Sequence, residues 1–352
     1  MRIATIFAKT AKKKKRSLKI GDQDIRMTTA EISGLWTTYI KCSATNCFYT
    51  HFLTYLKDEG IKTLVEENLR INLETMEKIR SIFLSEGFPI PDGFTEKDVD
   101  ISAPPLYSDL FALSFVYRGG QVTSSHFTTI VGAVARNDIY EFFEICLKKS
   151  LSLYKQSLQL MLEKGIYDRP PKMNYPQSIE YISHQPSLME SWLGERRPLN
   201  ALELSELFFV IERNCIGIIL LRGFIQTSKD KEVKEYLKKG KKLSERQITT
   251  FNNVLVKDDA FPTYPVSMEI TSSTIAPFSE KLMLFFISSS NSVGLSTLCH
   301  AITMSTRKDL AVHYTLFVTE IMKYGSDGLK LLVERGWMEK PPQEHGWGSL
   351  ND

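Results

Sequence analysis

The chain has 352 residues, of which 43% are hydrophobic and 24% are charged, and its formal net charge is +3 at pH 7. These values are ordinary for a globular protein, and the length suits two domains better than one core. No apolar run approaches the roughly 18 to 20 residues that a membrane-spanning helix needs, so we expect no membrane span.

The segment of residues 1–24 is strongly basic, and we expect a disordered extension or the product of a start codon assigned too far upstream. No acid precedes Asp22, whereas bases accumulate there: Arg2, Lys9, Lys12, Lys13, Lys14, Lys15, Arg16 and Lys19. Two alternatives stay open, namely an arm that binds anions and a targeting segment. The short apolar opening, with its charges after it, differs from a secretory signal peptide.

The first two helices are predicted from a capping motif and from the spacing of apolar residues. Thr28 and Glu31 form the Thr-x-x-Glu pattern of a capping box, which starts a helix that ends near Lys57. A second helix, over about residues 61–86, has its apolar residues at helical spacing. These residues are Ile61, Leu64, Val65, Met76, Ile79, Ile82 and Phe83. Since few residues separate the two helices, they should be antiparallel neighbours.

A long connection follows the second helix. Residues 87–107 contain four prolines: Pro89, Pro91, Pro104 and Pro105. A segment of this length can run from one end of a bundle to the other. We expect a third helix from near Ser108 and a fourth from near Asp138, with Gly165 as the left-handed cap where the fourth helix ends. A long crossover at this place is the arrangement of ferritin-like four-helix bundles.

The same order of signals returns about 170 residues later, which indicates an internal repeat. Matching pairs include Glu31 with Glu203, Phe52 with Phe224, Ser108 with Ser279, Asp138 with Asp309, and Gly165 with Gly336. We therefore predict an all-α protein made of two tandem ferritin-like four-helix bundles. The expected boundaries are 25–171 for the first bundle, 172–199 for a connector with at most a short helix, 200–342 for the second bundle, and 343–352 for a tail.

These repeated signals resemble those of a known family. They comprise the capping box, a crossover that opens with Gly87-Phe88-Pro89-Ile90-Pro91, an Arg-x-Asp start of the fourth helix, and a Glu-Lys/Arg-Gly end followed by two prolines. Over roughly residues 26–345, this order resembles the tandem ferritin-like family of Bacillus-type spore formers catalogued as domain-of-unknown-function family 3231. The resemblance implies a ferritin-like fold in a cytosolic or spore-associated protein, and some relatives are labelled putative spore-coat proteins.

A ferritin-like fold raises the question of a di-metal site. Such a site needs a Glu from each of two helices and a Glu-x-x-His from each of the other two, and the chain has no Glu-x-x-His. The nearest imitations, whose side chains point away from the apolar stripes, are Glu74, Glu77, Glu141 and Glu144. We therefore expect no catalytic residue, cofactor or metal. His51, His126 and Glu144 remain as weak metal candidates.

Most residues that recur in both repeats are explained as structural caps. These are Thr28 and Glu31, Asn200 and Glu203, and the two glycines Gly165 and Gly336. Asp109 and Glu280 recur at the start of the third helix, where the helix dipole favours an acid.

The middle of the third helix is small and polar in both copies, at residues 119–125 and 288–294. Such residues lower helix propensity. Three explanations stay open: close packing of the two bundles through their third helices, a kink that lines a ligand cavity, or a break in the helix. We expect docking through the third helices, so that Ser290→Leu should weaken it.

We thus predict a non-catalytic structural or interaction protein of a spore-forming bacterium, cytoplasmic or spore-associated. The alternative is a ligand-binding or metal-dependent ferritin-like protein that uses a cavity beside the third helix. The expected partners are unidentified proteins such as those of spore layers. We expect no specific nucleic acid, because the charged face at residues 238–246 lacks interleaved aromatic residues. The five cysteines are expected to be free buried thiols.

Overall fold

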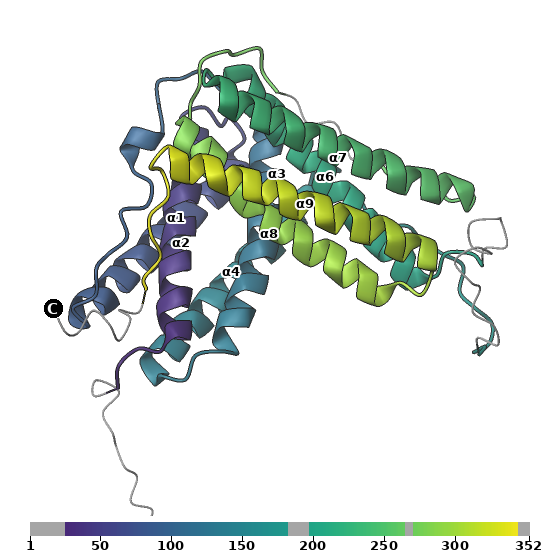
Figure 1. Ribbon diagram of the computed structural model, residues 1–352, viewed down its shortest axis with the longest axis horizontal. Coiled ribbons are helices and arrows are strands. Elements are labelled where there is room, and N and C mark those ends of the chain that lie inside the picture. The colour runs from purple at the N-terminus through teal and green to yellow at the C-terminus, as the bar shows by residue number, and fades with distance from the viewer. Residues whose placement is uncertain (1–24, 182–196, 265–269, 344–352) are drawn as a thin grey trace, which may run out of the picture.

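The computed structural model describes residues 25–181, 197–264 and 270–343. Within these ranges the chain forms eight long α-helices, one short 3-10 helix and no β-strand (Figure 1). The first half contains α1 (Thr29–Leu53), α2 (Glu59–Ser85), η2 (Glu96–Asp98), α3 (Asp109–Val131) and α4 (Asn137–Glu163). The second contains α6 (Ala201–Thr227), α7 (Lys231–Lys257), α8 (Glu280–Met304) and α9 (Lys308–Glu334). The predicted tandem of four-helix bundles is confirmed.

The helices begin where side chains cap them. Ser108 and Ser279 accept hydrogen bonds from the first turns of α3 and α8. The first helix is shorter than predicted, because it ends at Leu53 rather than near Lys57. The chain must leave the helix there so that Asp58 can cap α2, where its carboxylate accepts the Ile61 N–H at 3.1 Å.

The order of the helices in each bundle is the predicted one. A buried cluster at one end of the first bundle contains Leu35 near the start of α1, Ile82 near the end of α2, Ile130 near the end of α3 and Phe143 near the start of α4. The hairpins α1–α2 and α3–α4 are therefore antiparallel, and α2 runs parallel to α3. The same topology holds in the second bundle, where Glu203 at the start of α6 lies beside the start of α9. A long crossover between the second and third helices is the connection that ferritin-like folds use.

The two crossovers pair with each other. Val99 of the first forms an antiparallel bridge with Phe278 of the second, and Tyr107 forms another with Ile270. The phenol of Tyr107 then donates a hydrogen bond to the Leu220 carbonyl of α6 at 2.8 Å. The ring occupies space that is open because residue 223 is glycine, since a Cβ there would lie 2.4 Å from the phenol oxygen. The crossovers thus help to join the bundles.

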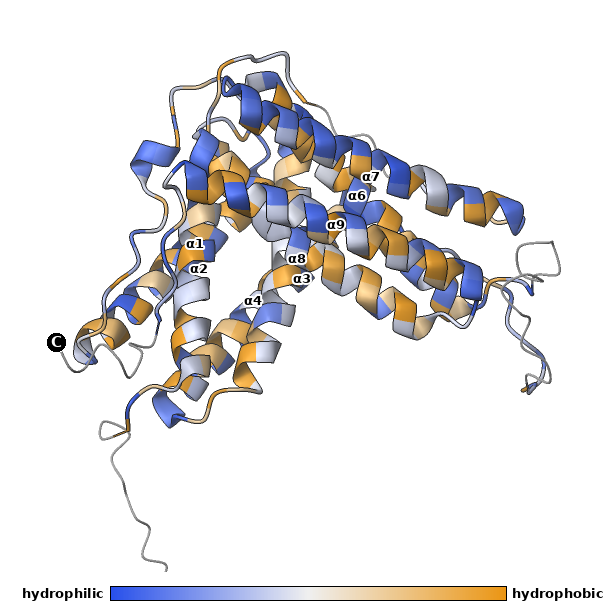
Figure 2. Ribbon diagram, in the orientation of Figure 1, coloured by the Kyte–Doolittle hydropathy of each residue, from blue (hydrophilic) through white to orange (hydrophobic). Residues whose placement is uncertain are grey.

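One hydrophobic core runs through both bundles. Its centre is aromatic: the Phe48 ring of α1 lies 4.3 Å from that of Phe278 and 4.6 Å from that of Phe286, and Phe115 of α3 stacks on Phe286 at 5.6 Å. Burying one such side chain contributes about 1.5 to 3 kcal/mol. Helix α7 carries many hydrophilic residues along its length (Figure 2).

The small polar segments of the third helices do not mediate this contact, which corrects our expectation. The helices themselves are unbroken through both segments. Gly120 instead allows α4 to approach α3 within the first bundle, since a Cβ there would lie 3.0 Å from the Cα of Tyr154. In the second bundle, Ser288 of α8 packs against Gly328 of α9 in a similar way. Aromatic rings from the first halves of α3 and α8 make the contact between bundles, because these rings are large enough to fill it.

Helix α8 bears on the expectation of no membrane span. By length and composition it could cross a membrane, and in the described part of the chain it is the one helix that passes this test. The reason is that serine, glycine and asparagine replace charged residues along most of its length. In the structure α8 packs beside α6 and α9 in the second bundle (Figure 1).

The cysteines are all free, but not all are buried. Cys42, Cys47 and Cys146 are buried, Cys215 is half-buried, and Cys299 is exposed on α8. Burial raises the pKa of the Cys42 and Cys47 thiols to about 12, which keeps them protonated and unreactive. The predicted N-terminal extension, most of the connector and nearly all of the predicted tail lie outside the described residues.

Candidate ligand-binding cavity

Glu31 and Glu203 link the first helix to the fourth at one end of their bundles. The Glu31 carboxylate caps α1 by accepting the Thr28 N–H at 2.7 Å, and it also accepts the Arg136 N–H at 2.8 Å from the start of α4. Glu203 accepts the Arg307 N–H at 3.2 Å in the same way. The caps were predicted from the sequence. The contact between the first and fourth helices was not, because it forms only in the folded chain.

Both carboxylates are ionised. Burial alone would raise their pKa, but hydrogen bonds outweigh burial and hold the pKa of Glu31 and of Glu203 below the usual value. Arg197 adds to this effect at Glu203, which its guanidinium contacts at 2.6 Å. These two acids therefore tie the first helix of each bundle to the fourth.

The Arg-x-Asp motifs form a second link between helices at the same end of each bundle. The guanidinium groups of Arg136 and Arg307 are nearly inaccessible to solvent, and each binds two carboxylates. The partners are Asp138 and Glu86 in the first bundle, and Asp309 and Asp258 in the second. Because Glu86 and Asp258 follow α2 and α7, each arginine joins the second helix to the fourth.

The opposite ends are tied by the remaining repeated residues. Asp109 accepts the Asp58 N–H at 3.0 Å, and Glu280 accepts the Asp230 N–H at 3.1 Å. The basic residue of each Glu-Lys/Arg-Gly motif then binds the aspartate that caps the second helix, as Arg335 does with Asp230 at 2.6 Å. Gly165 and Gly336 have positive φ values of 68° and 65°, as their capping role requires. The repeated polar motifs are therefore structural.

The weak metal candidates lie in unrelated places. His51 is fully buried and its Nε2 donates to the Ala103 carbonyl at 3.2 Å. His126 lies 3.3 Å from the Thr38 hydroxyl, and Glu144 pairs with Lys148 on the surface at 2.9 Å. Among the residues that the structure describes, no group of three or more His, Cys, Asp and Glu side chains could hold a metal ion.

The two histidines are neutral at pH 7. Burial lowers the pKa of His51. Burial and the positive charge of Lys41 lower the pKa of His126 to about 4.

A cavity of about 330 Å³ lies between the bundles and extends into the second one. Helices α1 and α3 line it from one side and α6, α7, α8 and α9 from the other. Most of its wall is apolar, with Phe115, Leu220, Leu243, Phe286 and Ile321 among the lining residues. Its size and lining are typical of small-molecule sites.

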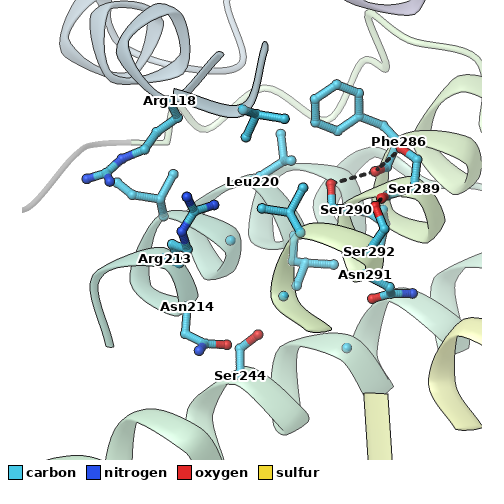
Figure 3. Close-up of a pocket in the computed structure, with 18 of the residues that line it drawn as sticks. Arg118, Arg213, Asn214, Leu220, Ser244, Phe286, Ser289, Ser290, Asn291 and Ser292 are labelled. Carbon is cyan, nitrogen blue, oxygen red and sulfur yellow. Dashed lines mark hydrogen bonds between the residues drawn. The ribbon is translucent and has the colours of Figure 1, made fainter. Parts of the chain in front are cut away.

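The small polar segments of the third helices line this cavity. Gly119, Val122 and Thr123 come from α3, and residues 289–294 come from α8. Of the three explanations left open by the sequence, the cavity therefore holds, and the helices that line it are unbroken. The serines of α8 lie across the cavity from Arg118 and Arg213 (Figure 3). Asn214 and Ser244 add further polar groups, and the Asn214 amide is held by Gln247 at 3.1 Å.

The charged residues that line the cavity are all cations. Its lining residues include three cations, Lys41, Arg118 and Arg213, and no carboxylate. Arg118 forms a bidentate ion pair with Glu212, a buried acid of α6 that lies outside the lining. Arg213 makes no hydrogen bond or ion pair with any described residue. The nearest polar contact of Lys41 is His126, 3.4 Å away.

The cavity makes the charged forms of these cations less favourable. Burial lowers the pKa of Arg213 and of Lys41. Burial, together with the charge of Arg213, also lowers the pKa of Arg118 to about 10, whereas Tyr117, Tyr167 and Asp168 act in the opposite direction. With three cations and no carboxylate among its lining residues, the cavity is electropositive.

Equivalent positions of the two repeats contribute to the lining. Lys41 and Arg213 are separated by the same number of residues as Phe52 and Phe224, and so are Thr45 and Gly217. The sequence analysis missed these cations, because each sits on an otherwise apolar helix. Their shared position in the repeat is the signal that could have revealed them.

These features define the chain as a tandem pair of four-helix bundles with repeated ties at the bundle ends and a cavity at the junction. The chain belongs to the family described as "Protein of unknown function (DUF3231)", which matches residues 16–179 and 187–347. The two matches correspond to the two repeats, and the resemblance noted in the sequence is confirmed.

A solved structure is similar to part of this chain. A putative spore coat protein from Bacillus halodurans is 22% identical with a TM-score of 0.40, and the match covers 43% of this chain and 99% of that chain. No curated protein matches.

Proposed function

We propose that the protein is a non-catalytic binding protein that holds one small, largely apolar molecule in the cavity between its bundles. The observation that carries this proposal is the cavity itself, about 330 Å³ in size and lined mostly by apolar side chains. The cavity opens to solvent, since Ser290 among its lining residues is exposed, so its apolar wall meets water. A ligand with an apolar body would remove this wall from water, which is favourable.

The polar groups of the cavity support binding rather than catalysis. They are hydroxyls, amides and protonated cations, such as those of Ser289, Asn214 and Arg213. No histidine or carboxylate occurs among the lining residues to act as a general base. The polar groups can orient a ligand without activating it.

A structural or interaction role in a spore-forming bacterium is the second candidate. The observation in its favour is that the repeated motifs tie helices together at the bundle ends, as in a protein selected for rigidity. A cytoplasmic or spore-associated location belongs to this proposal, and its partners would be other proteins. Incorporation of the protein into purified spores would test it.

Gly217 offers a direct test of the binding proposal. A Cβ at this position would meet no atom within 4 Å, so a larger side chain can enter the cavity without a clash. Replacing a helical glycine also favours the helix, by up to about 1 kcal/mol. Gly217→Leu should therefore fold at least as stably as the wild type while filling the site.

The neutral fluorescent probe N-phenyl-1-naphthylamine reports occupancy by its emission in apolar surroundings. We expect saturable binding to the wild type and at least about tenfold weaker binding to Gly217→Leu. Gly132→Leu is the matched control, because Gly132 caps α3 on the surface away from the lining. Equal probe binding by all three proteins, or none by the wild type, would overturn the proposal.

A further inference from the structure

The charge of the cavity lining specifies its ligand further. Three cations and no carboxylate line a mostly apolar space, and the acids that act on them, Glu212 and Asp168, act on Arg118 rather than on Arg213. Removing a cation from water is unfavourable unless an anion compensates it. Arg213 is half-buried at this place, and the equivalent residue of the first repeat, Lys41, lines the cavity while it stays exposed to solvent.

Arg213 is the better placed of the two for recognition. Its guanidinium lies at the cavity near that of Arg118 (Figure 3). Arg118 is already held by Glu212 through both of its terminal nitrogens, so its remaining donors are few. Arg213 keeps its planar fork of N–H donors, and this geometry matches a carboxylate with two parallel hydrogen bonds.

The apolar wall continues from these cations into the second bundle. Leu220 lies close to them on α6, and Leu243 and Ile321 line the deeper part between α7 and α9. A ligand that reaches from the cations into this part must combine an anionic group with an apolar body. A small inorganic anion would leave the apolar part empty, and a neutral hydrocarbon would leave the charge uncompensated.

We infer that the cavity binds an anionic amphiphile, a molecule with one carboxylate-like group and an apolar chain, whose anionic group is held by Arg213 with support from Lys41. This inference rests on the proposed binding function. It adds the chemical class of the ligand and the two residues that select it.

Calorimetric titration with four probes tests the inference: decanoate, decanol, protonated decylamine and inorganic phosphate. Decanoate should bind at least about tenfold more tightly than decanol, since a charge-assisted hydrogen bond is worth that factor. Decylamine should bind more weakly than decanol, because its charge meets Arg213. Phosphate at millimolar concentration should not displace decanoate, because it lacks the apolar chain.

Substitutions assign the selectivity to the cations. Arg213→Met keeps an unbranched apolar stem without the charge and should reduce the preference for decanoate over decanol about tenfold, while decanol binding persists. Arg213→Lys should restore part of the preference, and Lys41→Met should have a smaller effect. Arg246→Met, at an exposed pair with Glu320, is the matched control and should change nothing.

The outcomes separate this inference from the function on which it rests. Equal affinities for decanoate and decanol, or a preference that survives Arg213→Met in a protein with a normal melting curve, would overturn the anionic class while leaving the binding function intact. Displacement of decanoate by phosphate would overturn the amphiphile. Failure of both decanoate and decanol to bind, with no binding of the neutral naphthylamine probe, would overturn the binding function itself.

Discussion

Arg118 of α3 and Glu212 of α6 form a bidentate ion pair across the junction of the two bundles, with one contact of 2.7 Å between Nη1 and Oε2. Both side chains are largely withdrawn from solvent, with 14% and 4% exposure. The pair compensates the charge of Glu212, a buried acid beside the cavity. It also joins the two repeats at a point where their sequences differ, since Ile40 occupies the position in α1 that corresponds to Glu212.

Removing the acid of this pair should destabilise the protein. In Glu212→Gln the Arg118 charge stays buried without its partner, and we expect a loss of about 3 kcal/mol in the free energy of unfolding, measured by urea denaturation. Replacing both residues by methionine should cost less than the single change. Glu235→Gln, which removes the acid of an exposed pair with Lys238, should stay within about 0.5 kcal/mol of the wild type. A loss equal to that of Glu235→Gln would contradict the buried pair.

The tie made by Glu203 gives a second prediction. Glu203→Gln replaces a fully buried carboxylate that accepts hydrogen bonds from Arg197 and from the backbone of Thr306 and Arg307. The expected loss is about 2 to 3 kcal/mol by urea denaturation, because these donors lose an ionised acceptor. Glu144→Gln on the surface is the control. If both variants unfold at the same urea concentration, the tie has no energetic role.

The half-buried His126 of α3 should make stability depend on pH. The pKa of His126 is lowered to about 4 in the folded protein, against about 6.5 in the unfolded chain, by burial and by Lys41. Between these values the unfolded chain binds more protons, so the stability contributed by neutral His126 is complete above about pH 6.5 and falls as the pH drops toward 4. One proton limits this slope to about 1.4 kcal/mol per pH unit, and partial exposure of the ring reduces it.

The comparison of His126→Gln with the wild type isolates this effect from the titration of carboxylates. The variant should lose less stability than the wild type between pH 6.5 and pH 4, as measured by urea denaturation at several pH values. His300→Gln, a change on the exposed side of α8, should follow the wild type. Parallel curves for His126→Gln and the wild type would show that His126 is not held neutral by the fold.

The absence of a di-metal centre remains a prediction. We expect the protein, purified without chelator and offered iron, manganese or zinc, to bind fewer than about one equivalent tightly and to show no metal-dependent shift in melting temperature. The reason is that Glu74 and Glu144 point outward and pair with lysines, while His51 and His126 are packed apart from them. Two equivalents per bundle, or a thermal shift abolished by Glu144→Ala, would refute this prediction.

Much of the fold could be predicted because its signals are local and occur twice. The helix α2 spans Glu59–Ser85, within two residues of the predicted 61–86 at each end, and Ser108 and Ser279 cap their helices as expected. Caps, prolines and apolar spacing act within a few residues of the chain, so they can be recognised without the folded structure. The length of the crossover then fixed the topology.

The cavity could not be predicted in this way, because it arises from residues of both repeats. Lys41, Arg118 and Arg213 look like ordinary helix-surface cations in the sequence, and only the docking of the bundles brings them to one space. The contact between bundles was also misjudged. We expected the small residues of the third helices to make it, whereas the aromatic rings of Phe48, Phe115 and Phe286 do so.

Ser290 illustrates this difference. It is exposed and lines the cavity, so Ser290→Leu should affect ligand binding more than docking of the bundles. Hydrogen exchange in α1 and α3 should stay close to that of the wild type, while the affinity for decanoate changes.

The most direct test of the binding account is a crystal structure of the protein soaked with 10-bromodecanoate, in which the anomalous signal of bromine locates the end of the chain. The account predicts a bromine peak inside the second bundle, between α7 and α9, with the carboxylate at Arg213. The absence of a peak in the cavity at a saturating concentration, or peaks confined to the protein surface, would contradict it.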